Sequence, residues 1–110
     1  MLPRVNRLSR AEIDEIIRRG RRAGGRPLGL RYLPVPGPAR FAIVVPAKEV
    51  KQSVARHRLK RRIRVLIREQ AGQSKPSRSC HAVIFAGSSA SQLPFPDLRE
   101  QLTQLFKQIQ

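Results

Sequence analysis

The stretch "SVARHRLKRRIRVLIRE", residues 53–69, carries apolar side chains at the spacing of an amphipathic helix. With a turn of about 100° per residue, one side of that helix collects five apolar residues: Ala55, Leu59, Ile63, Leu66 and Ile67. We therefore predict a helix over about residues 50–69 that packs this apolar stripe against the rest of the fold.

The other sides of the same helix are crowded with positive charge. Seven Arg or Lys residues lie between positions 56 and 68, and no acidic residue lies among them. Arg58 with Arg62 and Arg64 with Arg68 are like-charged neighbours, and each such pair costs about 0.2–0.5 kcal/mol in an isolated helix. A face that served only solubility would intersperse glutamate, so the pattern predicts a surface that contacts a polyanion.

The whole chain shares this bias. It contains 23 Lys and Arg residues, 18 of them Arg, against 7 Asp and Glu, which gives a net charge of +16 at pH 7. The excess belongs to residues 1–78, whereas residues 79–110 carry two bases and two acids. Because the guanidinium fork fits phosphate groups and base edges, nucleic acid is the favoured partner.

Membrane and duplex DNA fit this helix less well. Its apolar stripe has no Trp or Phe of the kind that anchors a basic helix in a lipid interface. A helix-turn-helix needs a second helix after a short turn, whereas an extended segment precedes this helix and a strand-like segment follows it. We therefore expect RNA, bound through phosphate contacts and shape.

The N-terminal part predicts another helix. Ser9 and Glu12 form a capping box for a helix over residues 9–20. Gly20 follows two arginines and is expected to be its left-handed cap.

Two further segments predict strands. The apolar runs 28–33 and 40–46 flank the turn-rich "PVPGP" and predict a β-hairpin. "CHAVIFAG", residues 80–87, predicts a strand buried on both faces, and a last amphipathic helix follows it. The order helix–strands–helix–strand–helix predicts an α+β fold, a single-domain α-β sandwich over residues 1–110 with helices on a mainly antiparallel sheet.

No motif predicts catalysis by the protein's own side chains. Cys80 is the only cysteine, which excludes an intramolecular disulfide, and its apolar neighbours indicate a buried thiol. His57 and His81 have no evident acidic partner in the sequence, and no P-loop, HExxH or CxxC motif is present. We expect no catalytic and no metal-ligating residue in this chain. The charged N-terminus and the lack of a long apolar run favour a soluble cytoplasmic protein without a membrane partner.

The run "VVPAKEVKQSVARHRLKRRIRVLIRE", residues 44–69, resembles the most characteristic segment of the bacterial ribonuclease P protein component. In that family a strand and a short lysine-containing turn lead into a helix with an Arg-Asn-Arg motif, an apolar residue and Lys-Arg. Residues 56–61 here read Arg-His-Arg-Leu-Lys-Arg, and Lys48 matches a turn lysine. "RLSRAEIDEIIRRG", "HAVIFAGSSASQL" and "LREQLTQLF" are similar to the family's opening helix, later strand and closing helix, so the resemblance covers nearly the whole chain.

The resemblance implies a fold and a function. The motif helix would sit in a left-handed crossover between parallel strands, an exception to the usual handedness. The protein would be a subunit of ribonuclease P, in which a catalytic RNA uses bound Mg²⁺ to cleave the 5′ leader from precursor tRNA. The expected partners are ribonuclease P RNA and precursor tRNA, with Mg²⁺ bound mainly by the RNA. No sequence feature determines whether the protein self-associates.

The resemblance also implies a set of RNA-binding residues: Lys48, Lys51, Arg56, His57, Arg58, Lys60, Arg61, Arg64 and Arg68. Of these, the residues expected to face the leader and the region near the catalytic metal are Arg56, His57, Lys60 and Arg64. Those expected to contact the RNA subunit are Arg58, Arg61 and Arg68. His57 stands where the family usually has Asn.

The family's leader cleft supplies the last candidates. Ile13 and Ile17 occupy positions where aromatic residues normally line that cleft, so apolar contact would replace base stacking. Tyr32 and Phe41 are candidates for a replacement aromatic wall, with ordinary core packing as the alternative.

A ribosomal or RNA-chaperone protein with no role in cleavage is the alternative interpretation. Similar α+β sandwiches with basic helices occur among such proteins, and a fold alone does not decide function. The Arg-X-Arg-apolar-Lys-Arg series after a strand and a lysine turn favours the ribonuclease P protein.

Overall fold

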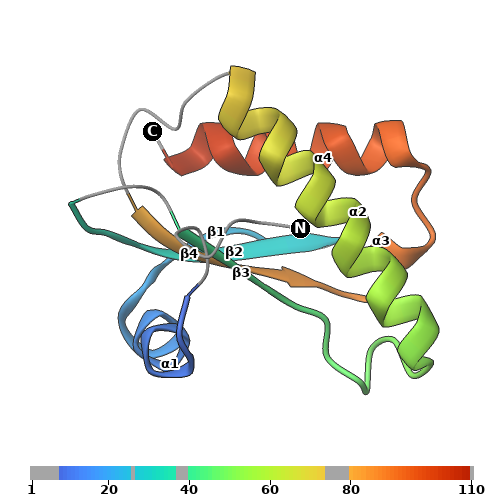
Figure 1. The fold of residues 1–110 in the computed structure, drawn as a ribbon, viewed down its shortest axis with the longest axis horizontal. Coiled ribbons are helices and arrows are strands. Elements are labelled where there is room, and N and C mark those ends of the chain that lie inside the picture. The colour runs from blue at the N-terminus through green and yellow to red at the C-terminus, as the bar shows by residue number, and fades with distance from the viewer. Residues whose placement is uncertain (1–7, 26, 37–39, 74–79, 110) are drawn as a thin grey trace.

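The computed structural model describes residues 8–25, 27–36, 40–73 and 80–109. In chain order its elements are α1 (Arg10–Arg19), β1 (Arg21–Gly24), β2 (Leu28–Pro34), β3 (Arg40–Val44), α2 (Ser53–Gln73), β4 (Cys80–Ala86), α3 (Ser88–Ser91) and α4 (Phe95–Ile109) (Figure 1). This order confirms the predicted α+β sandwich.

Within the described residues, the strands form one sheet in the order β1-β2-β4-β3. β1 pairs with β2 and β2 with β4 in antiparallel fashion, whereas β3 and β4 run parallel. The predicted hairpin of residues 28–33 with 40–46 is therefore wrong, because β4 lies between these two strands. β4 is rich in apolar residues, and its central position pairs both of its edges while the helices cover most of its two faces. The hairpin that forms joins β1 to β2 and contains Gly24 at φ 70°, a conformation that favours glycine.

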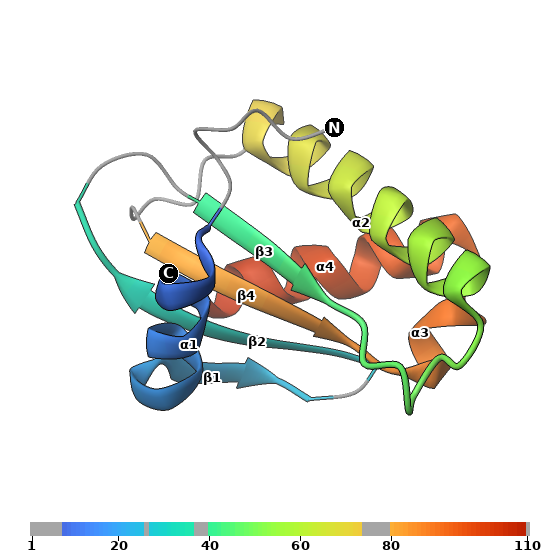
Figure 2. The ribbon, with the colours of Figure 1, turned by 60° about the horizontal axis from the view of Figure 1, so that its bottom comes forward.

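The sheet lies between two helical layers (Figures 1 and 2). α1 covers one face, where Ile16 and Val83 are buried. α2 and α4 cover the other face and form the main core with the sheet, in which the largest fully buried side chains include Leu59, Ile63, Ile84, Leu98 and Leu102.

The connection from β3 through α2 to β4 is left-handed, as the family resemblance implies. In Figure 2, β3 and β4 both run to the right, β4 lies below β3, and α1 lies in front of the sheet. Because α2 packs in the core on the opposite face, the chain passes behind the sheet between the two parallel strands.

α1 begins as predicted and ends differently. The backbone N–H of Glu12 donates to the Ser9 hydroxyl and that of Ser9 to the Glu12 carboxylate, the two bonds of a capping box. The predicted left-handed cap is wrong, since Gly20 is extended at φ −73° and ψ 155°. Glycine is needed there for space, because a Cβ would lie 2.4 Å from the Ile16 carbonyl oxygen. The chain then passes directly into β1. This strand was not predicted from the sequence, because it is short and charged and only Ala23 of it is buried.

Candidate nucleic-acid interface

α2 turns one side to the core, as its apolar spacing predicts. Leu59, Ile63, Leu66 and Ile67 are each at most 1% exposed, and Ala55 packs against the same core. Full burial of a large aliphatic side chain contributes about 1.5–3 kcal/mol, so this set fixes the rotation of the helix about its axis. The cations on its other sides are therefore held in defined directions.

These cations differ in exposure. The exposed group consists of His57, Arg58, Arg61 and Arg68, and the partly buried group consists of Arg56, Lys60 and Arg64. Lys48 and Lys51 are exposed in the segment that precedes the helix. All nine predicted RNA-binding residues thus lie on α2 or within a few residues of its start.

Arg56 ties the segment before α2 to the helix. The helix begins at Ser53 rather than near position 50, because residues 46–50 form a turn closed by backbone hydrogen bonds. The Nη1 atom of Arg56 donates to the carbonyl oxygens of Val50 and Lys51, each at 2.9 Å. The backbone at Lys51 is therefore held close to the first turn of the helix.

A polar seam joins one flank of α2 to α4. The Nη2 atom of Arg62 donates to the Leu93 carbonyl oxygen at 2.9 Å, and its guanidinium lies 5.8 Å from the ring centroid of Phe95. The Arg99 guanidinium lies 5.1 Å from the same centroid, and its Nε atom is 2.9 Å from Oε2 of Glu69. These contacts give Arg62 a structural role in joining α2 to the segment around Phe95, as Arg56 has one at the start of the helix.

The seam also decides which flank of α2 stays accessible. Nε2 of Gln70 donates to the Thr103 hydroxyl at 2.7 Å, so α4 runs along this flank for several turns. Lys60 and Arg64 lie on the opposite flank of the apolar stripe. α2 also contacts β3, which is an edge strand of the sheet.

The face of the sheet opposite α2 carries the cleft residues predicted on α1. Ile16 is 1% exposed beneath this helix, and Ile13 and Ile17 on either side of it stay partly exposed. They can therefore offer apolar contact beside the sheet.

Two interactions fix α1 on this face. Oε2 of Glu12 lies 3.0 Å from Nη1 of Arg40 at the start of β3, and the guanidinium of Arg31 on β2 donates to the Ile17 carbonyl oxygen. The hydrogen bonds from the Ser9 backbone and hydroxyl, and then the charge of Arg40, hold the pKa of Glu12 below its ordinary value of 4.5. These contacts between α1 and the sheet could not be predicted from the sequence, because the residues that make them come from different elements.

Phe85 lies on the same face of the sheet as α1. It was not identified as a candidate from the sequence, because β4 was expected to be buried on both sides. His81, Val83 and Phe85 alternate with the core residues of β4, and Phe85 is partly exposed. It lines two shallow pockets of about 170 Å³ and 200 Å³. The alternation in "CHAVIFAG", with the polar His81 on one face, is the signal that could have found it. An accessible ring of this kind can stack on an RNA base.

The aromatic wall expected from Tyr32 and Phe41 is not present. Phe41 is 5% exposed, and its ring centroid lies 5.7 Å from that of Phe106 in the main core. Tyr32 pairs with Ala82 and packs against the same core. Both side chains alternate with the residues of the α1 face, so the pleat directs them to the α2–α4 side. We therefore remove them from the leader-cleft candidates.

The titratable groups of β4 are Cys80 and His81. Burial raises the pKa of the Cys80 thiol, which keeps it protonated. His81 does have an acidic neighbour, because its Nδ1 lies 3.8 Å from Oε2 of Glu12. In the described part of the chain, no group of three or more His, Cys, Asp or Glu is placed to hold a metal ion. No helix within those same residues is long and apolar enough to cross a membrane.

A comparison of the chain with protein families supports the resemblance that the basic helix and its left-handed crossover indicate. The family model for ribonuclease P matches residues 2–110. The chain belongs to the ribonuclease P protein family. This membership favours the ribonuclease P interpretation over the ribosomal or RNA-chaperone alternative.

Two curated relatives carry the name ribonuclease P protein component. The protein of Shouchella clausii is 30% identical over 97 residues, which cover 87% of this chain and 78% of that protein. The protein of Microcystis aeruginosa is 40% identical over 74 residues, which cover 62% of each chain. The aligned part thus spans about three fifths of the Microcystis protein's length.

Solved structures of ribonuclease P proteins share the fold. The protein from Thermotoga maritima superposes with a TM-score of 0.82 at 23% identity, covering 94% of this chain and 97% of that one. The protein from Staphylococcus aureus gives a TM-score of 0.78 at 18% identity, covering 93% of both chains. The shared fold includes the order of helices and strands described above.

Proposed function

We propose that this chain binds ribonuclease P RNA and the 5′ leader of precursor tRNA and thereby assists the endonucleolytic 5′ maturation of tRNA. The observation that carries the proposal is the orientation of α2, whose buried stripe and contacts with α4 direct its exposed cations outward. Arginine is permanently protonated and cannot serve as a general base, so the RNA subunit is expected to carry the chemistry.

The outer side of α2 is the surface we assign to the RNA subunit. Arg58, Arg61 and Arg68 are exposed there, with Lys48 and Lys51 in the adjoining segment. Each phosphate they neutralise releases counterions, which makes binding tighter at low salt. Their spread along the helix suits the phosphate backbone of a folded RNA rather than individual base edges.

The leader is assigned to the other flank of α2 and to the α1 face. The cations on that flank are Arg56, His57, Lys60 and Arg64. Because β3 is an edge strand, a single strand of RNA could pass from this flank around β3 to the opposite face of the sheet. Ile13 and Ile17 would give apolar contact there, and Phe85 would supply the stacking that Tyr32 and Phe41 cannot.

Magnesium enters the proposal through the RNA. The described residues of the protein offer no cluster that fits the ion, so we route no step through a protein-bound metal. The Mg²⁺ ions of the reaction would be held mainly by RNA phosphates, and the cations of α2 would stabilise the meeting of two polyanions around them. As a partner of this RNA, the protein would act in the cytoplasm.

Reconstitution tests the proposal. The purified protein is added to a bacterial ribonuclease P RNA and a 5′-labelled precursor tRNA, at magnesium too low for efficient cleavage by the RNA alone. We expect the protein to raise the cleavage rate several-fold and to cleave nothing without the RNA. Lys107→Ala, on an exposed position of α4, is the control that should keep this effect. No increase with the wild type would overturn the proposal and favour the ribosomal or RNA-chaperone alternative.

A further inference from the structure

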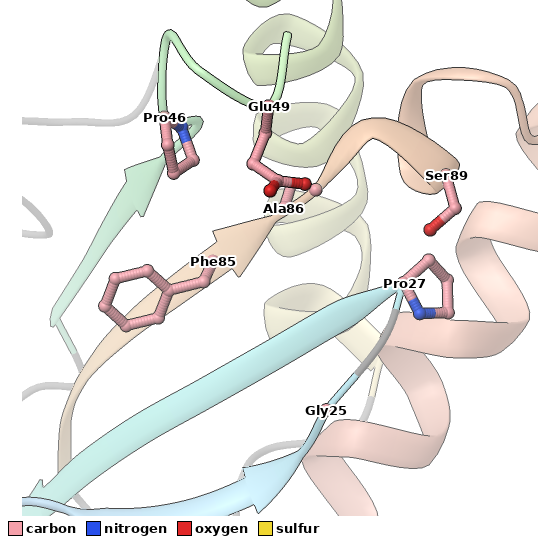
Figure 3. A pocket seen from close by; sticks show the side chains of 8 residues that line it. Gly25, Pro27, Pro46, Glu49, Phe85, Ala86 and Ser89 are labelled. Atoms are coloured by element: carbon pink, nitrogen blue, oxygen red, sulfur yellow. The ribbon is translucent and has the colours of Figure 1, made fainter.

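A small pocket lies at the end of the sheet where the parallel strands β3 and β4 both finish. Pro27, Pro46 and Phe85 form apolar walls, and the Glu49 carboxylate projects between them (Figure 3). Its volume of about 170 Å³ is well below the roughly 300–1,000 Å³ of pockets that take drug-sized ligands. The pocket is therefore suited to one ring system rather than to a dinucleotide.

The backbone holds the Glu49 carboxylate in this position. Its Oε1 atom accepts a hydrogen bond from the N–H of Ser88 at 3.3 Å, and a Cβ on Gly87 would lie 3.1 Å from the same oxygen. Within the described residues, the structure shows no ion pair and no other hydrogen bond for this side chain. Other described acids do pair with arginines, namely Glu12, Glu15 and Glu69. Oε2 of Glu49 thus remains as an acceptor without a partner among the described residues, on a side chain that lines the pocket.

These walls select a flat ring that donates hydrogen bonds. An ionised carboxylate only accepts hydrogen bonds and repels phosphate, whereas proline and phenylalanine rings favour an apolar face. Cytosine presents an amino group where uracil presents a carbonyl oxygen, and glutamate accepting from that cytosine amino group is a known pairing. Ser89, which also lines the pocket, has a hydroxyl that can donate to a ring nitrogen.

A second pocket next to the first indicates that the ring belongs to a polynucleotide. It has a volume of about 200 Å³, is lined by Arg22, Arg31 and the glycine backbone of β1 and β2, and shares Phe85 and Gly25 with the first. Arg22 and Arg31 are cross-strand partners that both line this pocket, and Arg31 also donates to the Ile17 carbonyl oxygen. Their combined positive charge favours an anion at the pocket. A phosphate there would adjoin a base in the first pocket.

We propose that the Glu49 pocket binds one unpaired nucleobase that carries an exocyclic amino group, stacked on Phe85 with the amino group donating to Glu49. The inference deepens the proposed function and rests on it for the source of the base, the single-stranded leader. The site discriminates against uracil, because its carbonyl oxygen would face the carboxylate.

Binding of short oligoribonucleotides tests the pocket without the RNA subunit. Fluorescence anisotropy compares cytidine and uridine oligomers of equal length on the wild type, Glu49→Gln and Glu100→Gln. We expect the wild type to bind the cytidine oligomer about three- to tenfold more tightly, as the net contribution of one hydrogen bond in a solvent-accessible pocket predicts. Glu49→Gln should bring the ratio close to one, because glutamine both donates and accepts. Glu100→Gln, which removes the same charge from an exposed position of α4, should keep the wild-type ratio.

A second variant separates stacking from amino-group recognition. Phe85→Leu should weaken both oligomers and leave their ratio in favour of cytidine, with thermal unfolding used to verify that each variant is folded. An equal preference in the wild type and Glu49→Gln would overturn the proposal, and so would a wild type that does not distinguish the two oligomers.

The reconstituted reaction identifies the source of the base and keeps the two proposals apart. Precursor tRNAs with an all-uridine leader and with single cytidines along it are cleaved with wild-type and Glu49→Gln protein. A cytidine preference that depends on Glu49 supports the leader as the source. A Glu49-dependent oligomer preference with no effect of leader base assigns the pocket to the RNA subunit instead. Stimulated cleavage with no Glu49 effect in either assay overturns the pocket proposal alone, and loss of stimulation with an intact oligomer preference overturns only the proposed function.

Discussion

Arg61 and Arg62 are adjacent, identical in type and expected to behave differently when replaced with alanine. Arg61 is exposed on the outer side of α2, whereas Arg62 donates to the Leu93 carbonyl oxygen and lies beside the Phe95 ring. Arg61→Ala should therefore weaken RNA binding without loss of stability. Arg62→Ala should lower stability and leave the salt dependence of RNA binding almost unchanged.

The size of the Arg61 effect follows from counterion release. One phosphate contact contributes about 0.7–0.9 to the slope of log K against log salt concentration. If wild type and Arg61→Ala converge near 1 M salt, the variant binds about tenfold more weakly at 50 mM and about three- to fourfold more weakly at 200 mM. Its free energy of unfolding should stay the same or rise by about 0.2–0.5 kcal/mol, because like-charged neighbours on the helix lose a repulsion.

The size of the Arg62 effect follows from its two contacts. The hydrogen bond from this partly exposed cation contributes about 1 kcal/mol, and its interaction with the Phe95 ring about 0.5–1 kcal/mol. A loss of about 1.5–2 kcal/mol lowers the Tm of a domain of this size by roughly 5–10 °C.

Filter binding to ribonuclease P RNA over a salt series, with thermal unfolding followed by circular dichroism, measures both quantities. The reasoning would be refuted if Arg61→Ala kept the wild-type slope, or if Arg62→Ala flattened it as much as Arg61→Ala while remaining fully stable.

Two further predictions concern stability. Ile63 is fully buried, so Ile63→Ala should lower the free energy of unfolding by about 2–5 kcal/mol in urea titrations, and an unchanged midpoint would mean that the apolar stripe is not in the core. Glu12→Gln retains the capping residue but loses the charge that pairs with Arg40. Because the pKa of Glu12 is lowered in the fold, its charge contributes stability in full above the ordinary value of 4.5, and this contribution is lost as pH falls through the lowered pKa. The free energy of unfolding of the wild type should therefore exceed that of Glu12→Gln near neutral pH and approach it in acid. Glu15→Gln, at an exposed position, should differ less from the wild type. Parallel curves of unfolding free energy against pH for the wild type and Glu12→Gln would contradict this.

Local pattern was sufficient to predict the helices α1, α2 and α4 and the basic side of α2. The capping box at Ser9 and the apolar stripe around Ile63 depend on residues within one or two turns of each other, so their geometry follows from the helical repeat. The uncompensated charge of α2 is likewise a property of consecutive residues. These features predicted the basic helix and the exposure of several of its cations.

The pairing of the strands, and the side of the sheet to which each side chain points, depended on residues far apart in the sequence. β4 separates β2 from β3, and the segment between β2 and β3 reads locally as a hairpin turn. The same pairing sends Phe41 into the core and leaves Phe85 accessible on the other face. A shift of one residue in a strand reverses its faces, so a short apolar run alone does not determine which side meets the core.

The sequence by itself determined that this protein has an amphipathic helix with a strongly basic outer side in an α+β order of elements, because both follow from the order of neighbouring side chains. Only the tertiary structure decided that Arg62 contacts Leu93 and the Phe95 ring of α4, and that Glu49 and Phe85 line the same pocket. Those contacts join elements far apart in the chain, and their partners are chosen by packing rather than by sequence separation.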